Sequence, residues 1–322
     1  ISDLRLHGFL ILIVAVLIYL YAKKNIARNL MLIGIIVIGL FDLLSVSAKT
    51  LHWDDKKQRD DALAETDYTK WLLSKEPETY TYRVAQMNRG NLITSNDLAY
   101  FRLHQFNGYQ GAKLRIYQDA VDVAGGENPF LLGLANVKYV ISDSPMKDTL
   151  SYVETYKGTG SIIYLNRFAM PRAFFVNEYK VEKGLDILNN IKVGGFDPRN
   201  TAFLEKKIDA VVDKADSTVS AKITNFGIHN IEYDVFASGN NLLVLNEVYY
   251  PAGWKAYIDG TETEIFKTNY FQRSVIVPKG KHKVELKFYP ETYYTGKKIS
   301  IAANVIVTIL LVGGIAGIFI SR

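Results

Sequence analysis

Residues 246–290 read NEVYYPAGWKAYIDGTETEIFKTNYFQRSVIVPKGKHKVELKFYP, and this stretch decides the fold of the C-terminal half. Apolar, β-prone runs alternate in it with short turn sequences, which predicts four strands. The dipeptide Asp259-Gly260 favours a two-residue hairpin, because a type I′ turn needs positive φ at both central positions. In the last strand one face carries His282, Val284, Leu286 and Phe288, and the other carries Lys283, Glu285 and Lys287. This alternation is typical of a strand with one face on a core and one in water.

Working outward from this stretch, a run of turn-forming residues, Gly194-Gly195-Phe196-Asp197-Pro198, marks a boundary. After it we expect only strands, at about 203–212, 218–225 and 230–237, before the quoted stretch begins. Many short strands separated by turn signals are typical of a β-sandwich, which we place at residues 196–296. Before the boundary, mixed helical and strand patterns predict an α/β domain at residues 48–195.

Three apolar runs lie near the ends of the chain, at about 4–21, 26–46 and 297–322. Each approaches the ~20 residues that a helix needs to cross a bilayer. No small-residue cleavage site follows the first run, which argues against a signal peptide. The predicted fold class is therefore an α+β membrane protein. It combines three transmembrane helices (two of them in residues 1–47) with a mixed α/β extracytoplasmic domain and a C-terminal antiparallel β-sandwich.

The orientation follows from the short loop between the first two apolar runs, which contains Lys23, Lys24 and Arg28. Short loops rich in Lys and Arg stay in the cytoplasm. We therefore expect residues 48–298 to lie on the extracytoplasmic side. Lys297 and Lys298 at the outer end of the last run oppose this orientation weakly, since long domains cross membranes largely regardless of charge.

The composition excludes several classes of function. The net charge of +5 is mild, and Lys and Arg are scattered among Asp and Glu, so we predict no nucleic-acid partner. The chain has no cysteine, which excludes disulfides, thiol catalysis and Cys-ligated zinc. No phosphate-binding glycine loop, zinc motif or Ser/His/Asp constellation is present. The acids at 54–61 match no calcium loop, so we predict no metal ligand. The first residue is Ile1, and we expect the chain to be part of a longer protein.

Two sets of residues are candidates for substrate binding. In the α/β domain, Arg89, Arg102 and Tyr109 belong to a polar cluster that is suited to a phosphorylated lipid or an acidic polymer. The alternative is ordinary loop chemistry. In the quoted stretch, Trp254 with Asp259, Asn269 and Arg273 is suited to a sugar ring, because aromatic faces pack on sugars and polar groups bond to their hydroxyls. The alternative is that the aromatic residues form the core and a membrane-interface belt.

Asp42 is an ionisable residue within the second apolar run. Such residues are costly in a membrane, so they are functional candidates by default. Asp42 also lies close to the end of the run, where its carboxylate reaches water. An interfacial role is therefore the alternative.

Several short pieces of the sequence, taken in order, resemble one family. They are Tyr82-Arg83-Val84, Asn107-Gly108-Tyr109, residues 134–141, Pro171-Arg172-Ala173, Phe196-Asp197-Pro198-Arg199, Tyr249-Tyr250-Pro251, Gly253-Trp254-Lys255-Ala256 and Asp259-Gly260. Through these pieces the chain resembles the C-terminal part of the YfhO family of bacterial multi-spanning membrane proteins. The resemblance covers nearly all residues from about 40 onward.

The resemblance implies a GT-C-like glycosyltransferase of the bacterial cytoplasmic membrane. Such an enzyme takes a sugar from a polyprenyl-phosphate carrier and attaches it to a cell-envelope acceptor. In GT-C enzymes the catalytic acid lies in the first extracytoplasmic loop, which we expect to precede Ile1. The partners implied are the lipid bilayer and a lipid-linked sugar or envelope polymer, and the need for a divalent metal stays open. The alternatives are a non-enzymatic module that binds envelope glycan or a partner protein, and a transporter of lipid-linked glycan.

Overall fold

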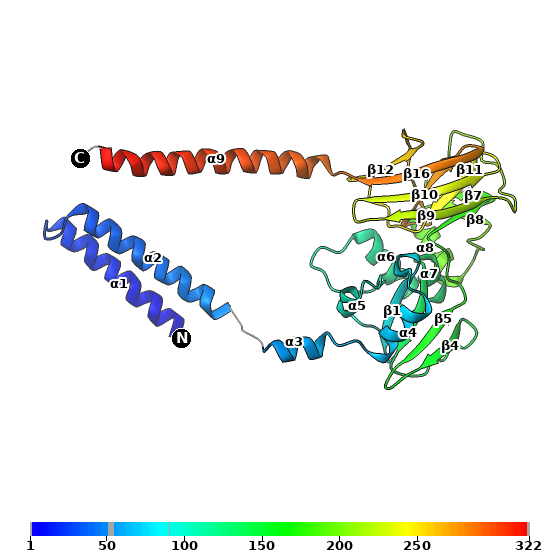
Figure 1. The fold of residues 1–322 in the computed structure, drawn as a ribbon, viewed down its shortest axis with the longest axis horizontal. Coiled ribbons are helices and arrows are strands. Elements are labelled where there is room, and N and C mark those ends of the chain that lie inside the picture. Colours follow the sequence, from blue (N-terminus) through cyan, green and yellow to red (C-terminus); the bar gives the residue numbers. More distant parts are fainter. Residues whose placement is uncertain (1, 51–54, 90, 321–322) are drawn as a thin grey trace. The chain divides into compact units, whose positions relative to one another are not determined.

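The computed structural model describes residues 2–50, 55–89 and 91–320, and its contacts divide the chain into two units, residues 1–64 and 65–322 (Figure 1). The first unit contains α1 (Ser2–Ala22), α2 (Arg28–Thr50) and the short α3 (Lys56–Ala62). The helices α1 and α2 pack as a helical hairpin. The turn between them places Lys24 at a φ of 60°.

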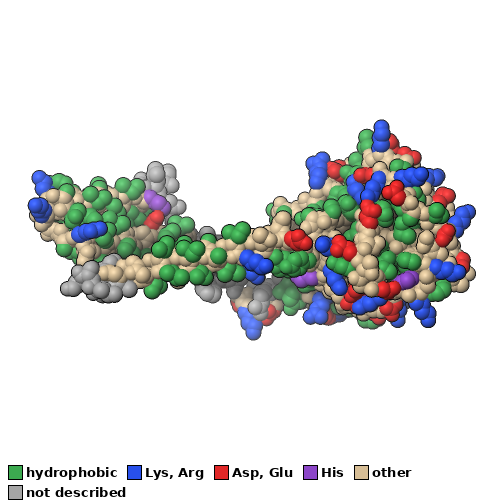
Figure 2. Space-filling model, turned by 90° about the horizontal axis from the view of Figure 1, so that it is seen from above, with side chains coloured by type: hydrophobic (Ala, Val, Ile, Leu, Met, Phe, Trp, Pro, Cys, Tyr) green, Lys and Arg blue, Asp and Glu red, His purple; other side chains and the backbone are tan. Residues whose placement is uncertain are grey.

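Among the residues that the structure describes, two helices are long and apolar enough to cross a membrane. They are residues Arg28–Ala48 of α2 and residues Glu291–Gly314 of α9 (Glu291–Ile320). Exposed apolar side chains line α9 (Figure 2). The prediction of three transmembrane helices is wrong in its count, because only two described helices qualify as candidate spans. The described apolar part of α1, Leu6–Ala22, falls short of the ~20 residues of a typical span. The last helix also begins earlier than the predicted residue 297.

The second unit begins with a five-stranded sheet in the order β2-β1-β3-β5-β4. Its strands are β1 (Arg83–Asn88), β2 (Asn91–Leu92), β3 (Val137–Ser142), β4 (Tyr152–Lys157) and β5 (Ile162–Asn166). The strands β1 and β3 are parallel, and the other neighbours are antiparallel. A parallel pair needs a long crossover, which here contains α5 (Asp97–Tyr100), α6 (Arg115–Ala124) and α7 (Pro129–Leu134).

Helices cover both faces of this first sheet. One face packs on α6, α7 and α8 (Gly184–Val193) through residues such as Val140, Leu131 and Ile187. The other face packs on α4 (Asp67–Lys75), where Leu72 is fully buried. The N-terminus of α7 follows its sequence, because Pro129 occupies the first turn and the Asn128 side chain accepts hydrogen bonds from the next two backbone amides.

Two further sheets contain the other strands. The five-stranded one is antiparallel, in the order β13-β12-β16-β10-β9, and the six-stranded one has the order β6-β11-β15-β14-β8-β7. The first contains β9 (Ser220–Phe226), β10 (Asn230–Ala237), β12 (Trp254–Ile258), β13 (Thr261–Thr263) and β16 (Gly280–Phe288). The second contains β6 (Ala173–Val176), β7 (Glu178–Val181), β8 (Thr201–Leu204), β11 (Asn241–Leu245), β14 (Phe266–Thr268) and β15 (Gln272–Val277).

These two sheets, which we call the two-sheet region, share one apolar core. Tyr233, Val284 and Leu286 enter it from one sheet, and Leu245 and Val275 enter it from the other. The strands β6 and β7 precede Gly194 and still pair with β11 and β8. The six-stranded sheet thus draws strands from both sides of the boundary expected at residues 195 and 196.

Several local predictions are confirmed. Asp259 and Gly260 have φ values of 49° and 84°, and they connect the paired strands β12 and β13. In β16, Val284 and Leu286 are fully buried, as the alternation predicts. Between residues 95 and 105 only α5 is helical. Arg102 has a φ of 58°, and Gln105 bridges to Val84 as extended chain.

Replacing Gly260 with Ala tests the hairpin. A Cβ there would meet no atom within 4 Å, so the cost is the positive φ alone, and we expect the free energy of unfolding to fall by about 1 kcal/mol. Thermal unfolding of the purified protein in detergent measures this. Gly111→Ala is the control, because the site is equally open and its φ is not positive. Equal loss in both variants would contradict the turn assignment.

Candidate functional site

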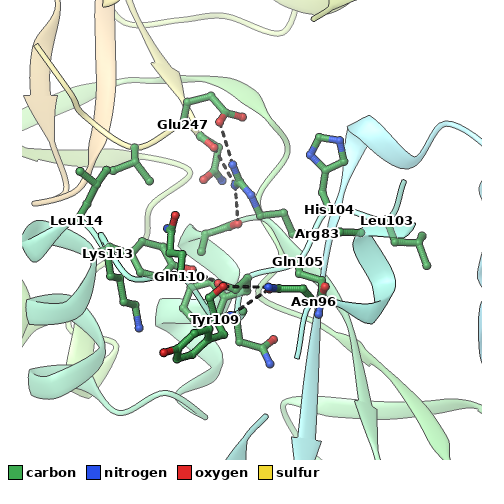
Figure 3. A pocket seen from close by; sticks show the side chains of 18 of the residues that line it. Arg83, Asn96, Leu103, His104, Gln105, Tyr109, Gln110, Lys113, Leu114 and Glu247 are labelled. Atoms are coloured by element: carbon green, nitrogen blue, oxygen red, sulfur yellow. Dashed lines mark hydrogen bonds and ion pairs between the residues drawn. The ribbon is translucent and has the colours of Figure 1, made fainter. Parts of the chain in front are cut away.

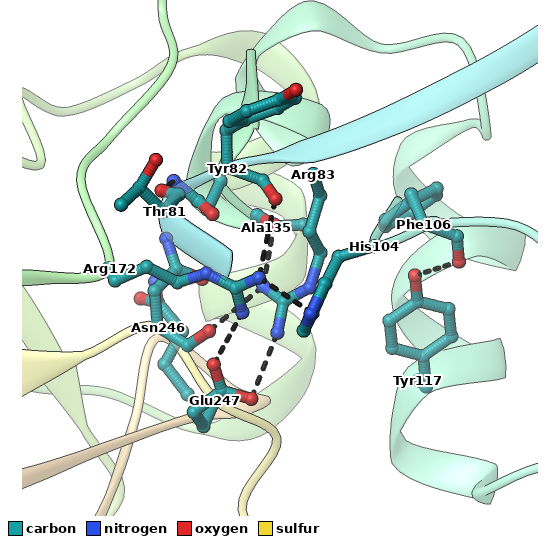
Figure 4. Close-up of polar contacts among 12 residues, drawn as sticks. Thr81, Tyr82, Arg83, His104, Phe106, Tyr117, Ala135, Arg172, Asn246 and Glu247 are labelled. Atoms are coloured by element: carbon teal, nitrogen blue, oxygen red, sulfur yellow. Dashed lines mark hydrogen bonds and ion pairs between the residues drawn. The ribbon is translucent and has the colours of Figure 1, made fainter. Parts of the chain in front are cut away.

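The most heavily charged buried cluster among the described residues centres on the carboxylate of Glu247. Its Oε1 lies 2.5 Å from Nη1 of Arg172, and its Oε2 lies 2.9 Å from Nη2 of Arg83 (Figure 4). The Nη1 of Arg83 also donates to the backbone carbonyl oxygens of Ala135, at 2.8 Å, and Asn246, at 2.9 Å. The two guanidinium groups therefore hold the carboxylate from both sides.

The cluster joins the sheets. Arg83 is the first residue of β1 in the first sheet, Arg172 immediately precedes β6, and Glu247 follows β11 in the six-stranded sheet. Because the three side chains come from positions far apart in the sequence, they meet only when both parts of the second unit are folded.

The electrostatics fit a permanently ionised Glu247. Burial alone would raise the pKa of this carboxyl, but the charges of Arg83, Arg172 and Arg273 outweigh burial and lower it below its ordinary value. Its oxygens are already bonded to two arginines. Glu247 therefore serves as a structural anion and is a poor general base.

His104 extends the cluster toward solvent. Its Nδ1 lies 3.1 Å from Nη2 of Arg172, and its ring contacts that of Phe226 at 5.1 Å between centroids. Burial, with the positive charges of Arg172 and Arg83, lowers the pKa of His104 from 6.5 to about 4. The imidazole is therefore neutral at pH 7, and its Nδ1 accepts the arginine hydrogen bond.

A large cleft of about 1010 Å³ opens beside this cluster (Figure 3). Arg83, His104 and Glu247 line one part of it. Residues 96–117, from the start of α5 into α6, supply much of the rest, including the amides Asn96, Gln105, Asn107 and Gln110 and the aromatic residues Phe106, Tyr109 and Tyr117. Phe226 and Ile228 come from the turn region between β9 and β10. The cleft is thus lined by both the helical part and the two-sheet region.

Tyr109 is held at the cleft by its backbone while its ring stays free. Asn96 accepts from the Tyr109 backbone N–H at 3.0 Å and donates to its carbonyl at 2.9 Å. The side chain is 74% exposed. Behind it, the Tyr117 hydroxyl donates to the Phe106 carbonyl at 2.5 Å. The arrangement presents one solvated aromatic ring on a fixed backbone.

The chemistry of the lining matches a polar ring-shaped ligand. Amide side chains both donate and accept hydrogen bonds, and exposed aromatic rings pack on flat apolar faces. Arg102 and Lys113 add positive charge, and the acid among the described lining residues, Glu247, is neutralised by its arginines. A sugar meets these demands through its hydroxyls and its C–H faces.

The comparisons with known proteins bear on the C-terminal part of the chain. Residues 202–300 match the family model described as "Bacterial membrane protein YfhO". We call residues 202–300 the YfhO-family region. No curated protein and no solved structure matches the chain. The YfhO-family region includes Glu247, Phe226 and Ile228, and therefore one part of the cleft lining.

The structure brings two of the predicted α/β residues to the cleft, since Arg102 and Tyr109 both line it. Arg89 lies elsewhere, beside a separate cavity of about 610 Å³ that is also lined by Ser144 and Lys147. Its backbone N–H donates to Asp143 at 2.8 Å. The three residues thus divide between two cavities.

The predicted residues of the YfhO-family region do not line the cleft. Asn269 is fully buried and exchanges hydrogen bonds with the Phe203 backbone. Arg273 is 3% exposed, and its guanidinium lies 4.5 Å from the ring of Trp254. Asp259 accepts from His282 at 2.6 Å in its hairpin turn. Their part in sugar binding stays a prediction.

In the first unit, Asp42 of α2 faces α1. Its Oδ1 lies 3.4 Å from Nε2 of His7, so the helical hairpin brings these two polar residues together within an apolar surface. His7 lies near the start of α1 and Asp42 lies toward the end of α2, which is the same end of the helical hairpin, but the sequence does not show that they pair. Among the residues that the structure describes, no group of three or more acids and histidines is placed to hold a metal ion.

Reasoning from the sequence did not select the Glu247 cluster. Arg83, Arg172 and Glu247 are single charges at strand ends, and they are separated by 89 and 75 positions (172 − 83 and 247 − 172). Each is unremarkable alone, because charges at strand ends are normally solvated. The available signal was that Arg83 and Arg172 each lie within a piece that resembles the family.

Glu247→Gln tests the cluster. The amide keeps the shape but leaves two buried guanidinium groups without an anion, so we expect the free energy of unfolding to fall by about 3–5 kcal/mol. Chemical unfolding of the purified protein measures it. Glu264→Gln removes an exposed partner of Lys206 and is the control, with little change expected. Similar losses in both variants would contradict the role of Glu247.

The lowered pKa of His104 predicts that the stability of the fold depends on pH. Above pH 6.5 its imidazole is neutral in the folded and the unfolded chain, but between pH 6.5 and about 4 only the unfolded chain binds the proton. Stability therefore falls as the pH falls through this window. We expect His104→Asn to flatten that part of the curve of melting temperature against pH. An unchanged slope in the variant would show that other groups cause the dependence.

Proposed function

We propose that this chain is the acceptor-facing extracytoplasmic and C-terminal membrane part of a GT-C-like glycosyltransferase. The enzyme acts on a polyprenyl-phosphate-linked sugar and a cell-envelope acceptor, in the bacterial cytoplasmic membrane. The YfhO-family match at residues 202–300 and the two candidate spans support the membrane part of this proposal.

The observation that carries the proposal is the cleft of about 1010 Å³ beside Glu247. Its volume is at the upper end of the range for small-ligand sites and suits an oligosaccharide segment better than one sugar. Its aromatic, amide and basic residues converge from two parts of the fold. A rigid cleft of this kind fixes the position of an acceptor, which is a large part of what catalysis of group transfer requires.

In this proposal the cleft binds and orients the acceptor, but it does not supply the catalytic acid or base. Glu247 is held by Arg83 and Arg172, and its lowered pKa keeps it from exchanging a proton near pH 7. His104 has a pKa of about 4 and donates no proton at neutral pH. The residues assigned to substrate are Arg102 and Tyr109, which line the cleft without strong internal partners for their side chains.

The proposed topology places the β-sandwich and the cleft outside the cytoplasm. The basic residues Lys23 and Lys24 lie in the short turn before α2, and such turns stay inside. The candidate span in α2 then leads outward, and the span in α9 returns. The protein is then multi-pass, with the second unit's folded part between these spans.

The second candidate function is a non-enzymatic, membrane-anchored module that binds envelope glycan. The same cleft supports it, and the neutralised Glu247 favours binding over chemistry. The two functions differ in whether sugar transfer depends on the cleft.

Tyr109→Ala separates them in sugar-transfer assays on membranes that contain the full-length protein. Losing the exposed ring removes a stacking contact, so we expect the KM for acceptor to rise about three- to tenfold with kcat largely kept. The control is Tyr100→Ala, an exposed tyrosine that does not line the cleft.

Three outcomes are informative. A rise in KM for Tyr109→Ala alone supports the transferase. Transfer that is unchanged in both variants overturns acceptor binding at the cleft. If glycan binding falls in Tyr109→Ala while sugar transfer does not depend on residues 65–296 at all, the chain acts as a binding module.

A further inference from the structure

Three segments meet at the end of the two-sheet region where the chain passes into α9. They are the turn between β9 and β10, the loop between β11 and β12, and the junction of β16 with α9. The Phe288 N–H donates to the His229 carbonyl at 2.9 Å, and the Tyr289 N–H donates to the Gly253 carbonyl at 2.7 Å. These backbone bonds fix the three segments side by side.

Large apolar and aromatic side chains are exposed on these segments. Ile228 is 87% exposed, Tyr293 is 61% exposed, Tyr289 is 51% exposed and Tyr250 is 39% exposed. We call these four residues the basal rim. Single exposed apolar residues are common on protein surfaces and need no explanation. Here, however, four of them gather where the polypeptide enters a candidate membrane span.

The positions of the charges in α9 set the depth of the rim. The helix extends from Glu291 to Ile320, and its uncharged run begins at Ile299, directly after Lys297 and Lys298. Lysine side chains extend their ammonium groups toward the headgroup layer, so the turns of α9 before Ile299 lie at that layer. Tyrosine is enriched at this depth, and Tyr289 stacks on Tyr294 with 4.3 Å between ring centroids.

We propose that the basal rim lies in the headgroup layer of the bilayer and forms a membrane contact in addition to α9. The bilayer is the occupant because the rim is continuous in sequence with the candidate span: Tyr289 and Tyr293 are within two residues of Glu291. The backbone hydrogen bonds of Phe288 and Tyr289 hold the segments that contain Ile228 and Tyr250 beside this junction. These two residues therefore lie at the same depth as Tyr289. This contact requires no enzymatic activity and is independent of the proposed function.

The contact also determines how the cleft is reached. Ile228 belongs to the basal rim and lines the cleft, and Val248 of the adjacent loop lines it too. One edge of the cleft is therefore at the membrane surface. A ligand attached to the bilayer reaches the cleft by moving in the plane of the membrane.

The chain contains no cysteine, so single cysteines can be labelled specifically. The experiment uses the full chain in vesicles of phosphatidylcholine and phosphatidylglycerol, with an environment-sensitive fluorophore on Ile228→Cys. Asn240→Cys is the matched control, because it is an exposed position beyond the other end of β10, a strand of 8 residues and about 26 Å in length. Headgroup spin-labelled lipid quenches the fluorophore, and iodide probes access from water.

We expect the lipid quencher to reduce the fluorescence at position 228 several-fold more than at position 240, with iodide showing the reverse order. Equal lipid quenching at the two positions overturns the proposal. A label at 228 that is protected from both quenchers also overturns it, since protein would then cover the rim. Both substitutions are at exposed positions, so folding is retained, and circular dichroism checks this.

Discussion

The structure of residues 65–322 depends on one buried carboxylate. Glu247 neutralises Arg83 and Arg172, which come from different sheets, and none of these charges could be buried without the others. The cluster therefore favours one docking geometry of the helical part on the two-sheet region. A purely apolar interface would tolerate small sliding movements, but paired charges with fixed hydrogen-bond geometry tolerate much less.

The Glu247 cluster also fixes the shape of the cleft. Arg83 and Glu247 form part of its lining, while the segment that carries Arg102 and Tyr109 is held to β1 by backbone bonds between Val84 and residues 104 and 106. Binding residues on a loop are positioned by the rigid elements beneath them. Here the rigid elements are a strand and an ionic cluster, and both border the segment that presents Tyr109.

The sequence predicts what depends on local pattern. The Asp259-Gly260 hairpin and the alternation along β16 follow from turn chemistry and side-chain periodicity. Arg102 and Tyr109 could be selected as candidate binding residues because they lie in one polar segment. The Glu247 cluster could not, since its members are brought together by tertiary packing alone. The predicted number of membrane helices, three, is wrong because the described apolar part of α1 does not qualify as a candidate span.

The six-stranded sheet has a consequence for how this protein can be divided. Its strands β6 and β7 come from the chain before Gly194, and they cover the edges of β11 and β8. A polypeptide that starts at residue 196 would leave both edges with open backbone groups, which pair readily with other chains. The YfhO-family region cut out in this way would therefore tend to aggregate, and the two parts cannot be exchanged as separate cassettes during evolution or engineering.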